Sequence, residues 1–270
     1  MYNCATDEVI LGDQIGQGNF GLVNVAYLKS AGRKMAVKIR RLTGDEEEDY
    51  HTFMDIEVPL RSIHCPYIVN FYGYHIFEAE ARLFMELMVT SIDKLLQQDI
   101  DFPEAVISTV SKSVLHGLEY LNQLKITYRD VKPSNILVNE VGEVKICDFG
   151  IAGTFEDSNC ICTFNPKYTF NIFQPERVRG DCSYSTKADV WSLGITLVEI
   201  ANKCNPYQGN WCTVCYEILY ADPPRLDSRI FSSNFCNFVN QCLCKRVEDR
   251  PSFAALLVTV YSVNLELASV

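Results

Sequence analysis

Residues 128–135 read Tyr-Arg-Asp-Val-Lys-Pro-Ser-Asn, and residues 148–150 read Asp-Phe-Gly. The first stretch places the carboxylate of Asp130 five residues before the amide of Asn135. The second stretch places another carboxylate, Asp148, directly after a strand-like run. Either stretch is short enough to occur by chance, so its meaning depends on the motifs that surround it.

A glycine-rich stretch lies upstream, where residues 16–23 read Gly-Gln-Gly-Asn-Phe-Gly-Leu-Val between two strand-like runs. A dinucleotide-binding fingerprint would instead lie between a strand and a helix. Glycines at this spacing let backbone N–H groups approach a phosphate closely, with Phe20 at the loop tip and Val23 placed to cover an adenine. The alternative interpretation is a glycine-rich hairpin that binds nothing.

Residues 35–38, Met-Ala-Val-Lys, place Lys38 inside an apolar strand-like run. A buried ammonium needs an anionic partner, and we expect Glu57, in the amphipathic segment that follows, to supply it. The alternative is a surface lysine with a buried aliphatic stem and an unrelated glutamate nearby. Because the four motifs occur in a fixed order, an accidental set is improbable.

The motifs together resemble those of the eukaryotic protein kinase family, and the resemblance covers residues 9–260. It implies an α+β fold of two lobes with ATP in the cleft between them. We expect a mostly β amino lobe at residues 1–87 and a mostly helical carboxyl lobe at residues 88–270.

The hydrophobic pattern agrees with such a chain. The acidic run at residues 45–49 is interpreted as a solvated loop ahead of the first helix. Strands are expected at residues 9–15, 22–28, 34–40, 68–75, 82–88, 136–138 and 144–146, and helices at residues 53–63, 106–124, 190–200, 235–244 and 253–260.

The resemblance also implies a role for each motif residue. Lys38 holds the α- and β-phosphates of ATP and pairs with Glu57. Asp130 orients and deprotonates the acceptor hydroxyl, Lys132 steadies the γ-phosphate, and Asn135 and Asp148 hold Mg²⁺. The expected nucleotide-binding residues, with Met85 as gatekeeper and Glu86 and Met88 as hinge, are Gly16, Gln17, Gly18, Asn19, Phe20, Gly21, Val23, Ala36, Lys38, Met85, Glu86, Met88, Asn135 and Asp148.

Three further residues match structural positions of the same family. Glu176 follows Gln174 and Pro175 where the family has Ala-Pro-Glu, and Arg250 resembles its buried ion-pair partner. Asp189 resembles the helix residue that braces the catalytic loop. Two departures are that Tyr128 replaces the usual histidine and that Gln174 replaces alanine or serine.

Closer matches, at residues 65–73 and 85–94, are similar to MAP kinase kinases, especially the stress-activated branch. This similarity implies a dual-specificity enzyme that phosphorylates Thr and Tyr in the activation loop of a MAP kinase and is itself activated by a MAP kinase kinase kinase. The docking segment that such enzymes carry upstream is not found in this sequence, so either the catalytic domain selects the MAP kinase or the chain is a fragment of a longer protein. One alternative is a Ser/Thr kinase with other protein substrates, and another is a scaffold pseudokinase, whose usual mark is loss of residues that are present here as Lys38, Asp130 and Asp148.

The same similarity predicts regulation through the segment after Asp148. Arg129 would bind an activating phosphate, as cations at this position do through charge-assisted hydrogen bonds. Ser158 and Thr163 are the predicted phosphorylation sites, and Thr169 is expected to bind substrate backbone instead. Cys147 is predicted to face the ATP cleft and to react with electrophiles there, and the alternative is a buried, inert thiol.

Composition excludes several other classes of protein. The net charge of −10 supplies no basic surface for nucleic acid or anionic membranes, and no apolar run approaches the length of a membrane helix. The 12 cysteines are scattered through apolar contexts, which favours a reducing compartment, the cytoplasm or also the nucleus. Cys212 and Cys215 have a metal-like spacing but lack a second pair at zinc-finger distance.

Overall fold

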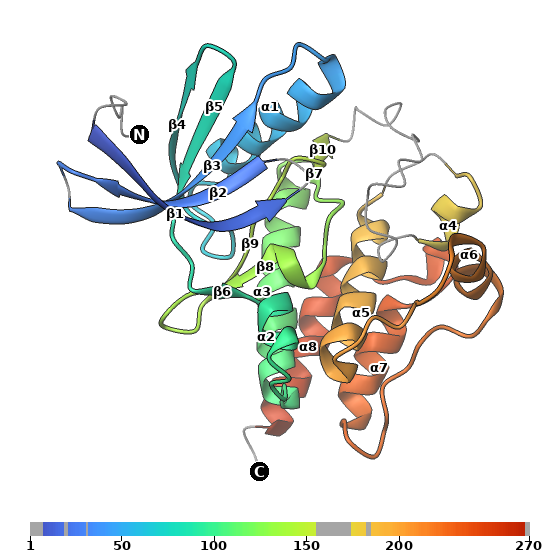
Figure 1. Cartoon of the computed structure of the whole chain (residues 1–270). Coiled ribbons are helices and arrows are strands. Elements are labelled where there is room, and N and C mark those ends of the chain that lie inside the picture. Colours follow the sequence, from blue (N-terminus) through green and yellow to red (C-terminus); the bar gives the residue numbers. More distant parts are fainter. Residues whose placement is uncertain (1–7, 19–20, 31, 155–173, 182–184, 268–270) are drawn as a thin grey trace.

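The amino-terminal part of the protein is a five-stranded antiparallel sheet, and the rest is mostly helical (Figure 1). The computed structural model describes residues 8–18, 21–30, 32–154, 174–181 and 185–267. The predicted fold, a β-rich part followed by a helical part, is confirmed. The sheet ends at Met85, whereas the division of the chain into lobes at residue 87 stays a prediction.

The strands follow the order β1-β2-β3-β5-β4 across the sheet. Strand β3 is central and mostly buried, and its alternate residues face opposite sides of the sheet. Val37 therefore packs into one apolar cluster, whereas Lys38 and Arg40 share the other face. The strands are β1 (Val9–Gly18), β2 (Gly21–Leu28), β3 (Arg33–Arg41), β4 (Phe71–Phe77) and β5 (Glu80–Met85).

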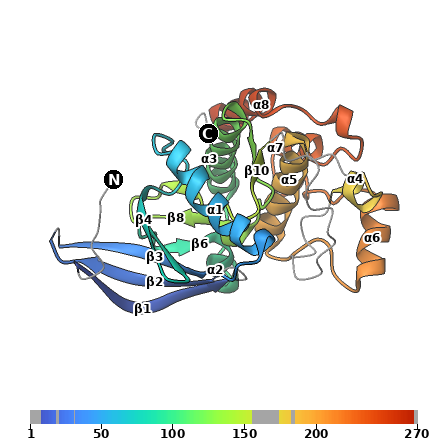
Figure 2. The same ribbon diagram turned by 90° about the horizontal axis from the view of Figure 1, so that it is seen from above.

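Helix α1 (Glu46–Arg61) lies between the sheet and the helical part (Figure 2). The prediction that residues 45–49 form a solvated loop was wrong, because these residues cap and begin the helix. The side chain of Asp45 accepts hydrogen bonds from the backbone N–H groups of Glu47 and Glu48. The following acidic residues lie in the first turn, where the helix dipole favours negative charge.

The helical part is built around α3 and α5, and α5 is buried on nearly all sides. Gly117 in α3 lets strand β9 approach closely, since an added Cβ would lie 3.0 Å from Ile146. The elements are β6 (Thr90–Ser91), α2 (Ile92–Gln97), α3 (Glu104–Gln123), β7 (Ile126–Thr127), the 3₁₀ helix η2 (Pro133–Asn135), β8 (Ile136–Val138), β9 (Val144–Ile146), β10 (Gly153–Thr154), α4 (Pro175–Val178), α5 (Thr186–Asn202), α6 (Trp211–Tyr220), α7 (Ser233–Cys242), the 3₁₀ helix η4 (Val247–Asp249) and α8 (Phe253–Leu267).

Short connections place the motif residues at one edge of this helical part. Strands β6, β8 and β9 form one small sheet, and β7 pairs with β10. The turn before β8 carries Asn135, and the residues after β9 carry Asp148, whose carboxylate contacts Lys38 of the large sheet. Within the described residues, no helix is both long and apolar enough to cross a membrane.

Candidate active site

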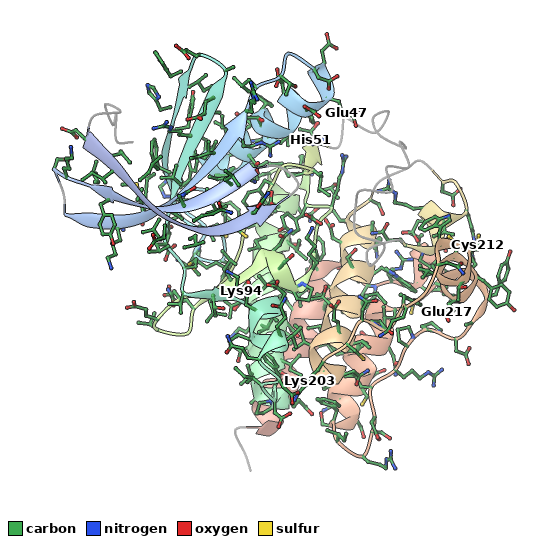
Figure 3. All side chains as sticks on the ribbon, in the orientation of Figure 1. Glu47, His51, Lys94, Lys203, Cys212 and Glu217 are labelled. Atoms are coloured by element: carbon green, nitrogen blue, oxygen red, sulfur yellow. The ribbon has the colours of Figure 1, made fainter. Side chains whose placement is uncertain are left out.

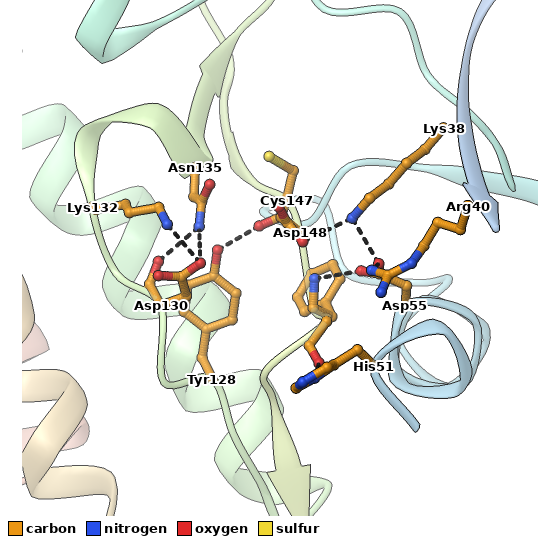
Figure 4. A network of polar contacts seen from close by, with 12 residues as sticks. Lys38, Arg40, His51, Asp55, Tyr128, Asp130, Lys132, Asn135, Cys147 and Asp148 are labelled. Atoms are coloured by element: carbon orange, nitrogen blue, oxygen red, sulfur yellow. Dashed lines mark hydrogen bonds and ion pairs between the residues drawn. The ribbon is translucent and has the colours of Figure 1, made fainter. Parts of the chain in front are cut away.

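Lys38 lies at the centre of a buried ion-pair network (Figure 4). Its Nζ atom lies 2.6 Å from Oδ2 of Asp55 and 2.8 Å from Oδ1 of Asp148. Burial alone would lower the pKa of Lys38, but the two carboxylates outweigh it and raise the pKa above its usual value. Lys38 therefore stays charged although it is buried.

The predicted pairing of Lys38 with Glu57 was wrong, because the partner on helix α1 is Asp55. Two positions along a helix turn a side chain by about 200°, so Asp55 and Glu57 cannot point the same way. Asp55 is 4% exposed, whereas Glu57 is only half-buried. The sequence did hold a signal, since Asp55 is flanked by the apolar residues Met54 and Ile56.

Asp148 begins the Asp-Phe-Gly segment in a left-handed backbone conformation, with φ of 63°. Burial would raise the pKa of its carboxyl, but Lys38 outweighs this and lowers the pKa, so Asp148 is ionised. The side chain keeps 29% of its surface exposed. The next residue, Phe149, donates its backbone N–H to Oδ1 of Asp55 at 2.9 Å, which ties the segment to helix α1.

Asp130 is held by two neighbours from its own loop. The amide nitrogen of Asn135 donates to Oδ2 of Asp130 at 2.7 Å and to its carbonyl oxygen at 3.0 Å. Lys132 places its Nζ 2.9 Å from the same Oδ2. Burial raises the pKa of Asp130 although Lys132 opposes this shift, and a carboxylate with a raised pKa is a better proton acceptor.

Asn135 and Asp148 fit the predicted divalent cation. The hydrogen bonds of Asn135 to Asp130 use its amide nitrogen, which leaves the amide oxygen as the ligand atom. Mg²⁺ binds few protein oxygens and keeps water and phosphate oxygens as its other ligands. The part of the chain that the structure describes has no cluster of three or more His, Cys, Asp or Glu arranged for a metal. The two-residue site does not need one.

Helix α5 fixes the backbone of the catalytic loop through Asp189. One carboxylate oxygen accepts the N–H of Tyr128 at 3.0 Å, and the other accepts that of Arg129 at 2.8 Å. Burial raises the pKa of Asp189 to about 6. The predicted bracing contact is therefore present in the structure.

Tyr128 links the catalytic loop to the Asp-Phe-Gly segment. Its hydroxyl donates a hydrogen bond to the carbonyl of Cys147. Its ring meets that of Phe149 edge-on, with centroids 5.5 Å apart. The tyrosine that replaces the usual histidine is thus a buried bridge between the two motifs.

Glu176 and Arg250 form the predicted buried ion pair. Both carboxylate oxygens accept from the guanidinium, at 2.6 and 2.7 Å. Gln174, which departs from the family pattern, is buried and donates to the hydroxyl of Ser192 in α5 at 3.0 Å. Its amide therefore anchors helix α4 on α5.

The hinge follows strand β5. Ala36 pairs with Met85 across the sheet, which places both at the start of the hinge. The N–H of Glu86 donates to the carbonyl of Asn70 at 2.9 Å, so the backbone group that Glu86 presents to an adenine is its carbonyl. The side chain of Glu86 is held by Lys145 at 2.8 Å and by Asn70, contacts that the sequence did not predict.

The glycine-rich hairpin continues the β1–β2 ladder, with Gly18 opposite Gly21 and Gly16 opposite Val23. Gly21 has φ of 139°, and an added Cβ would lie 2.2 Å from the carbonyl oxygen of Ile39. Glycine is therefore required there. Asn19 and Phe20, both predicted to bind nucleotide, lie outside the described residues.

Lys94 in α2 makes a second connection, besides the hinge, between the helical part and the large sheet. Its Nζ donates to the carbonyl oxygen of Ile15 in β1 at 3.0 Å, next to the glycine-rich stretch (Figure 3). Cys212 lies on α6, away from this region, as the same view shows. Ser158, Thr163 and Thr169 lie outside the described residues.

Comparison with known proteins agrees with this geometry. A family model described as a protein kinase domain matches residues 10–262. The dual specificity mitogen-activated protein kinase kinase mek-1 of Caenorhabditis elegans is 39% identical over 94% of this chain and 73% of that protein. The corresponding kinase hemipterous of Drosophila melanogaster is 38% identical, over 96% of this chain and 22% of that protein. Dual specificity mitogen-activated protein kinase kinase 7 of Mus musculus is 35% identical, over 95% and 49%. The chain therefore spans less than half the length of the latter two.

Proposed function

The chain belongs to the protein kinase family and, within it, to the MAP kinase kinases, and we propose that it phosphorylates Thr and Tyr in the activation loop of a MAP kinase. Two groups of polar contacts carry this proposal: Lys38 with Asp55 and Asp148, and Asp130 with Asn135. A scaffold without catalysis has no need of this arrangement. The names of the three relatives support the choice of substrate.

Each of these residues has a separate role in phosphoryl transfer, which is mostly positioning and charge neutralisation. Lys38 holds the α- and β-phosphates. Lys132 is close enough to Asp130 to stabilise the γ-phosphoryl group during its transfer. Asp130 accepts the proton of the acceptor hydroxyl. We propose Mg²⁺ as the divalent cation, held by oxygens of Asn135 and Asp148; it supplies charge neutralisation on the phosphate oxygens when bound.

The test is to incubate the purified chain with Mg-ATP and a panel of inactive MAP kinases, and then to map the phosphorylated residues. We expect phosphate on both Thr and Tyr of one activation loop. Asp130→Asn and Asp148→Asn are the controls, and each should lower transfer by several orders of magnitude. Transfer confined to Ser and Thr of other proteins would support the Ser/Thr kinase alternative. ATP binding without any transfer would support a scaffold.

We further propose that a MAP kinase kinase kinase activates this chain and that both work in the cytoplasm or also in the nucleus. Eight cysteines among the described residues are free thiols, which supports a reducing compartment. Imaging of the tagged chain in cells, with markers for both compartments, tests the location. Accumulation in the secretory pathway would overturn it.

A further inference from the structure

His51 is the first buried residue of helix α1. It is 4% exposed, whereas the helix residues before it, at positions 46–50, are exposed or half-buried. Its Nδ1 lies 2.5 Å from the carbonyl oxygen of Gly150, the last residue of the Asp-Phe-Gly segment. A carbonyl oxygen can only accept a hydrogen bond, so Nδ1 carries a proton and donates it. His51 therefore joins the amino-terminal half of α1 to this segment.

Asp55 makes a second connection, one helical turn later on the same face of α1. Its Oδ1 accepts the N–H of Phe149 at 2.9 Å. Its Oδ2 lies 2.6 Å from both Nζ of Lys38 and Nη1 of Arg40, so strand β3 holds this carboxylate in place (Figure 4). Helix α1 thus binds two successive residues of the segment, through the N–H of Phe149 and the carbonyl of Gly150.

Gly150 lies against the carboxylate that we propose to hold the divalent cation. A Cβ added to Gly150 would lie 3.6 Å from Oδ1 of Asp148 and 3.4 Å from Oδ2 of Asp55. The left-handed backbone of Asp148, with φ of 63°, is unfavourable by itself and persists only where surrounding contacts hold it. A shift of Gly150 would therefore displace the Asp148 carboxylate.

Two hydrogen bonds restrain the segment in a way that one cannot. A single bond, from Asp55 to Phe149, would leave the segment free to pivot about that bond. A second bond from the neighbouring turn of the helix removes this freedom. Without His51, the buried carbonyl of Gly150 would lose this donor, and an unsatisfied buried group costs more than a hydrogen bond contributes.

We propose that His51 is a positioning residue for phosphoryl transfer. Together with Asp55, it fixes the Asp-Phe-Gly segment on helix α1 and so holds the Asp148 carboxylate in place for the divalent cation. His51 acts through Gly150, while Asp55 keeps its pairing with Lys38. The inference rests on the kinase chemistry proposed above, but not on the identity of the protein substrate.

Four variants of helix α1 test the proposal. His51→Phe keeps a ring but removes the donor, and His51→Leu is a second removal variant in case the first does not fold. His51→Asn keeps an amide N–H that can still donate to Gly150. The control is Thr52→Val at the neighbouring buried position, where the hydroxyl has no hydrogen-bond partner within the described part of the chain.

Hydrogen exchange at the Phe149 amide gives a readout without catalysis. Its protection is compared with that of the Leu193 amide in the buried helix α5, which reports global unfolding. We expect the relative protection to fall at least about fivefold in the two removal variants, which is the effect of one buried hydrogen bond on an equilibrium. It should fall less in His51→Asn and stay unchanged in Thr52→Val. Equal relative protection in a folded removal variant and in Thr52→Val would overturn the inference.

Kinetics separate positioning from a merely structural role. Misplacement of catalytic groups by about 1 Å can cost up to about a hundredfold, so kcat should fall at least about tenfold in His51→Phe. KM for ATP should change much less at saturating Mg²⁺, because the hinge contacts are intact. His51→Asn should restore part of kcat. The proposal would be refuted by equal kcat in His51→Phe and Thr52→Val, or by a lower kcat with unchanged protection of Phe149.

The two proposals can fail separately. Transfer is measured to any accepted protein or to the chain itself. If no transfer to any protein occurs, the proposed function fails, but exchange at the Phe149 amide still decides whether His51 holds the segment. If the unmutated chain is active and the removal variants exchange and turn over as Thr52→Val does, only the role of His51 fails.

Discussion

Asp55 and Glu57 differ by two positions on one helix, yet only Asp55 contacts Lys38. We expect Asp55→Asn to lower kcat/KM by at least about tenfold, because the amide cannot balance two buried cations. Glu57→Gln should stay within about twofold, as substitutions away from such features usually do. Initial rates at several ATP concentrations measure both. A larger loss for Glu57→Gln than for Asp55→Asn would contradict the assignment.

Gly153 leaves no room for a side chain beside Arg129. An added Cβ would lie 2.4 Å from the guanidinium, which is buried. Gly153→Ala should therefore displace Arg129 and weaken the activation that its charge supports, by several-fold. The measurement is the ratio of rates after and before treatment with an upstream kinase.

Gly12→Ala is the matched control for this experiment, because its Cβ would make an ordinary contact of 3.4 Å. It should leave the activation ratio unchanged. A Gly153→Ala protein that is activated as strongly as the unmutated chain would show that the position of Arg129 is unimportant.

Cys147 precedes Asp148 and is half-buried. Burial first, and then the charge of Asp148, raises the pKa of its thiol above the usual value. The thiolate is the reactive form, so an ATP-site electrophile should label Cys147 slowly at pH 7 and faster as pH rises. Excess ATP should suppress the labelling. Exposed Cys212 serves as the reference in the same mass spectrum, and ATP-insensitive labelling of Cys147 would count against its place in the cleft.

These residues also show which features of the site could be predicted from the sequence and which could not. The resemblance of their motifs to those of protein kinases placed Asp130, Asn135 and Asp148 in one predicted chemical site. The partner of Lys38 depended on the rotational phase of α1, which the apolar pattern from residue 53 did not fix. The helix begins at Glu46, where a capping aspartate and acidic residues looked like a solvated loop.

Among the elements, helix α5 positions the catalytic loop through one titratable group, the carboxyl of Asp189. The native pKa of Asp189, about 6, lies above its ordinary value. Protonation below this pH weakens its acceptor role, so kcat should fall as pH decreases through 6. The pKa of Asp130 is also raised, so protonation of this carboxylate should likewise lower activity as pH decreases. Hydrogen exchange at the Tyr128 and Arg129 amides reports Asp189 separately, and their protection relative to the intrinsic exchange rate at each pH should decrease as pH falls through 6.

Titration of Asp189 changes the stability of the folded protein in the opposite direction to kcat as pH decreases. Because the native pKa exceeds that of the unfolded chain, the protonated group favours the folded state. The contribution of Asp189 is fully present below about pH 4 and is lost as pH rises through 6. Asp189→Asn should remove this part of the pH dependence of the unfolding temperature. An unchanged dependence would contradict the raised pKa.

Some of the predicted helices and strands match the structure and others do not, and each outcome has a physical reason. Strands β8 and β9 match their predicted ranges because each is a short apolar run bounded by polar turns. Helices α2 and α6 were not predicted. Helix α2 has only six residues, and α6 buries few side chains, so neither shows a clear apolar period.

For the whole molecule, we expect phosphorylation of the segment after Asp148 to activate the enzyme. Ser158 and Thr163 are the predicted acceptors, and each phosphate adds about −1.5 to −2 charges that Arg129 can bind. Activation by an upstream kinase should fall in Ser158→Ala and Thr163→Ala and be lost in the double variant. Acidic replacements should mimic activation only in part. Full activation of the double variant would exclude both sites.

The bond from Lys94 in α2 to Ile15 in β1 joins the helical part to the large sheet, in addition to the hinge. Strand β1 carries part of the glycine-rich stretch that we propose to bind nucleotide, so we expect the lifetime of this bond to contribute to the residence time of ADP. An exposed charge-assisted bond contributes at most about 1 kcal/mol, or roughly fivefold in a rate. We therefore expect a side chain that takes no part in the chemistry to contribute to the turnover of this enzyme.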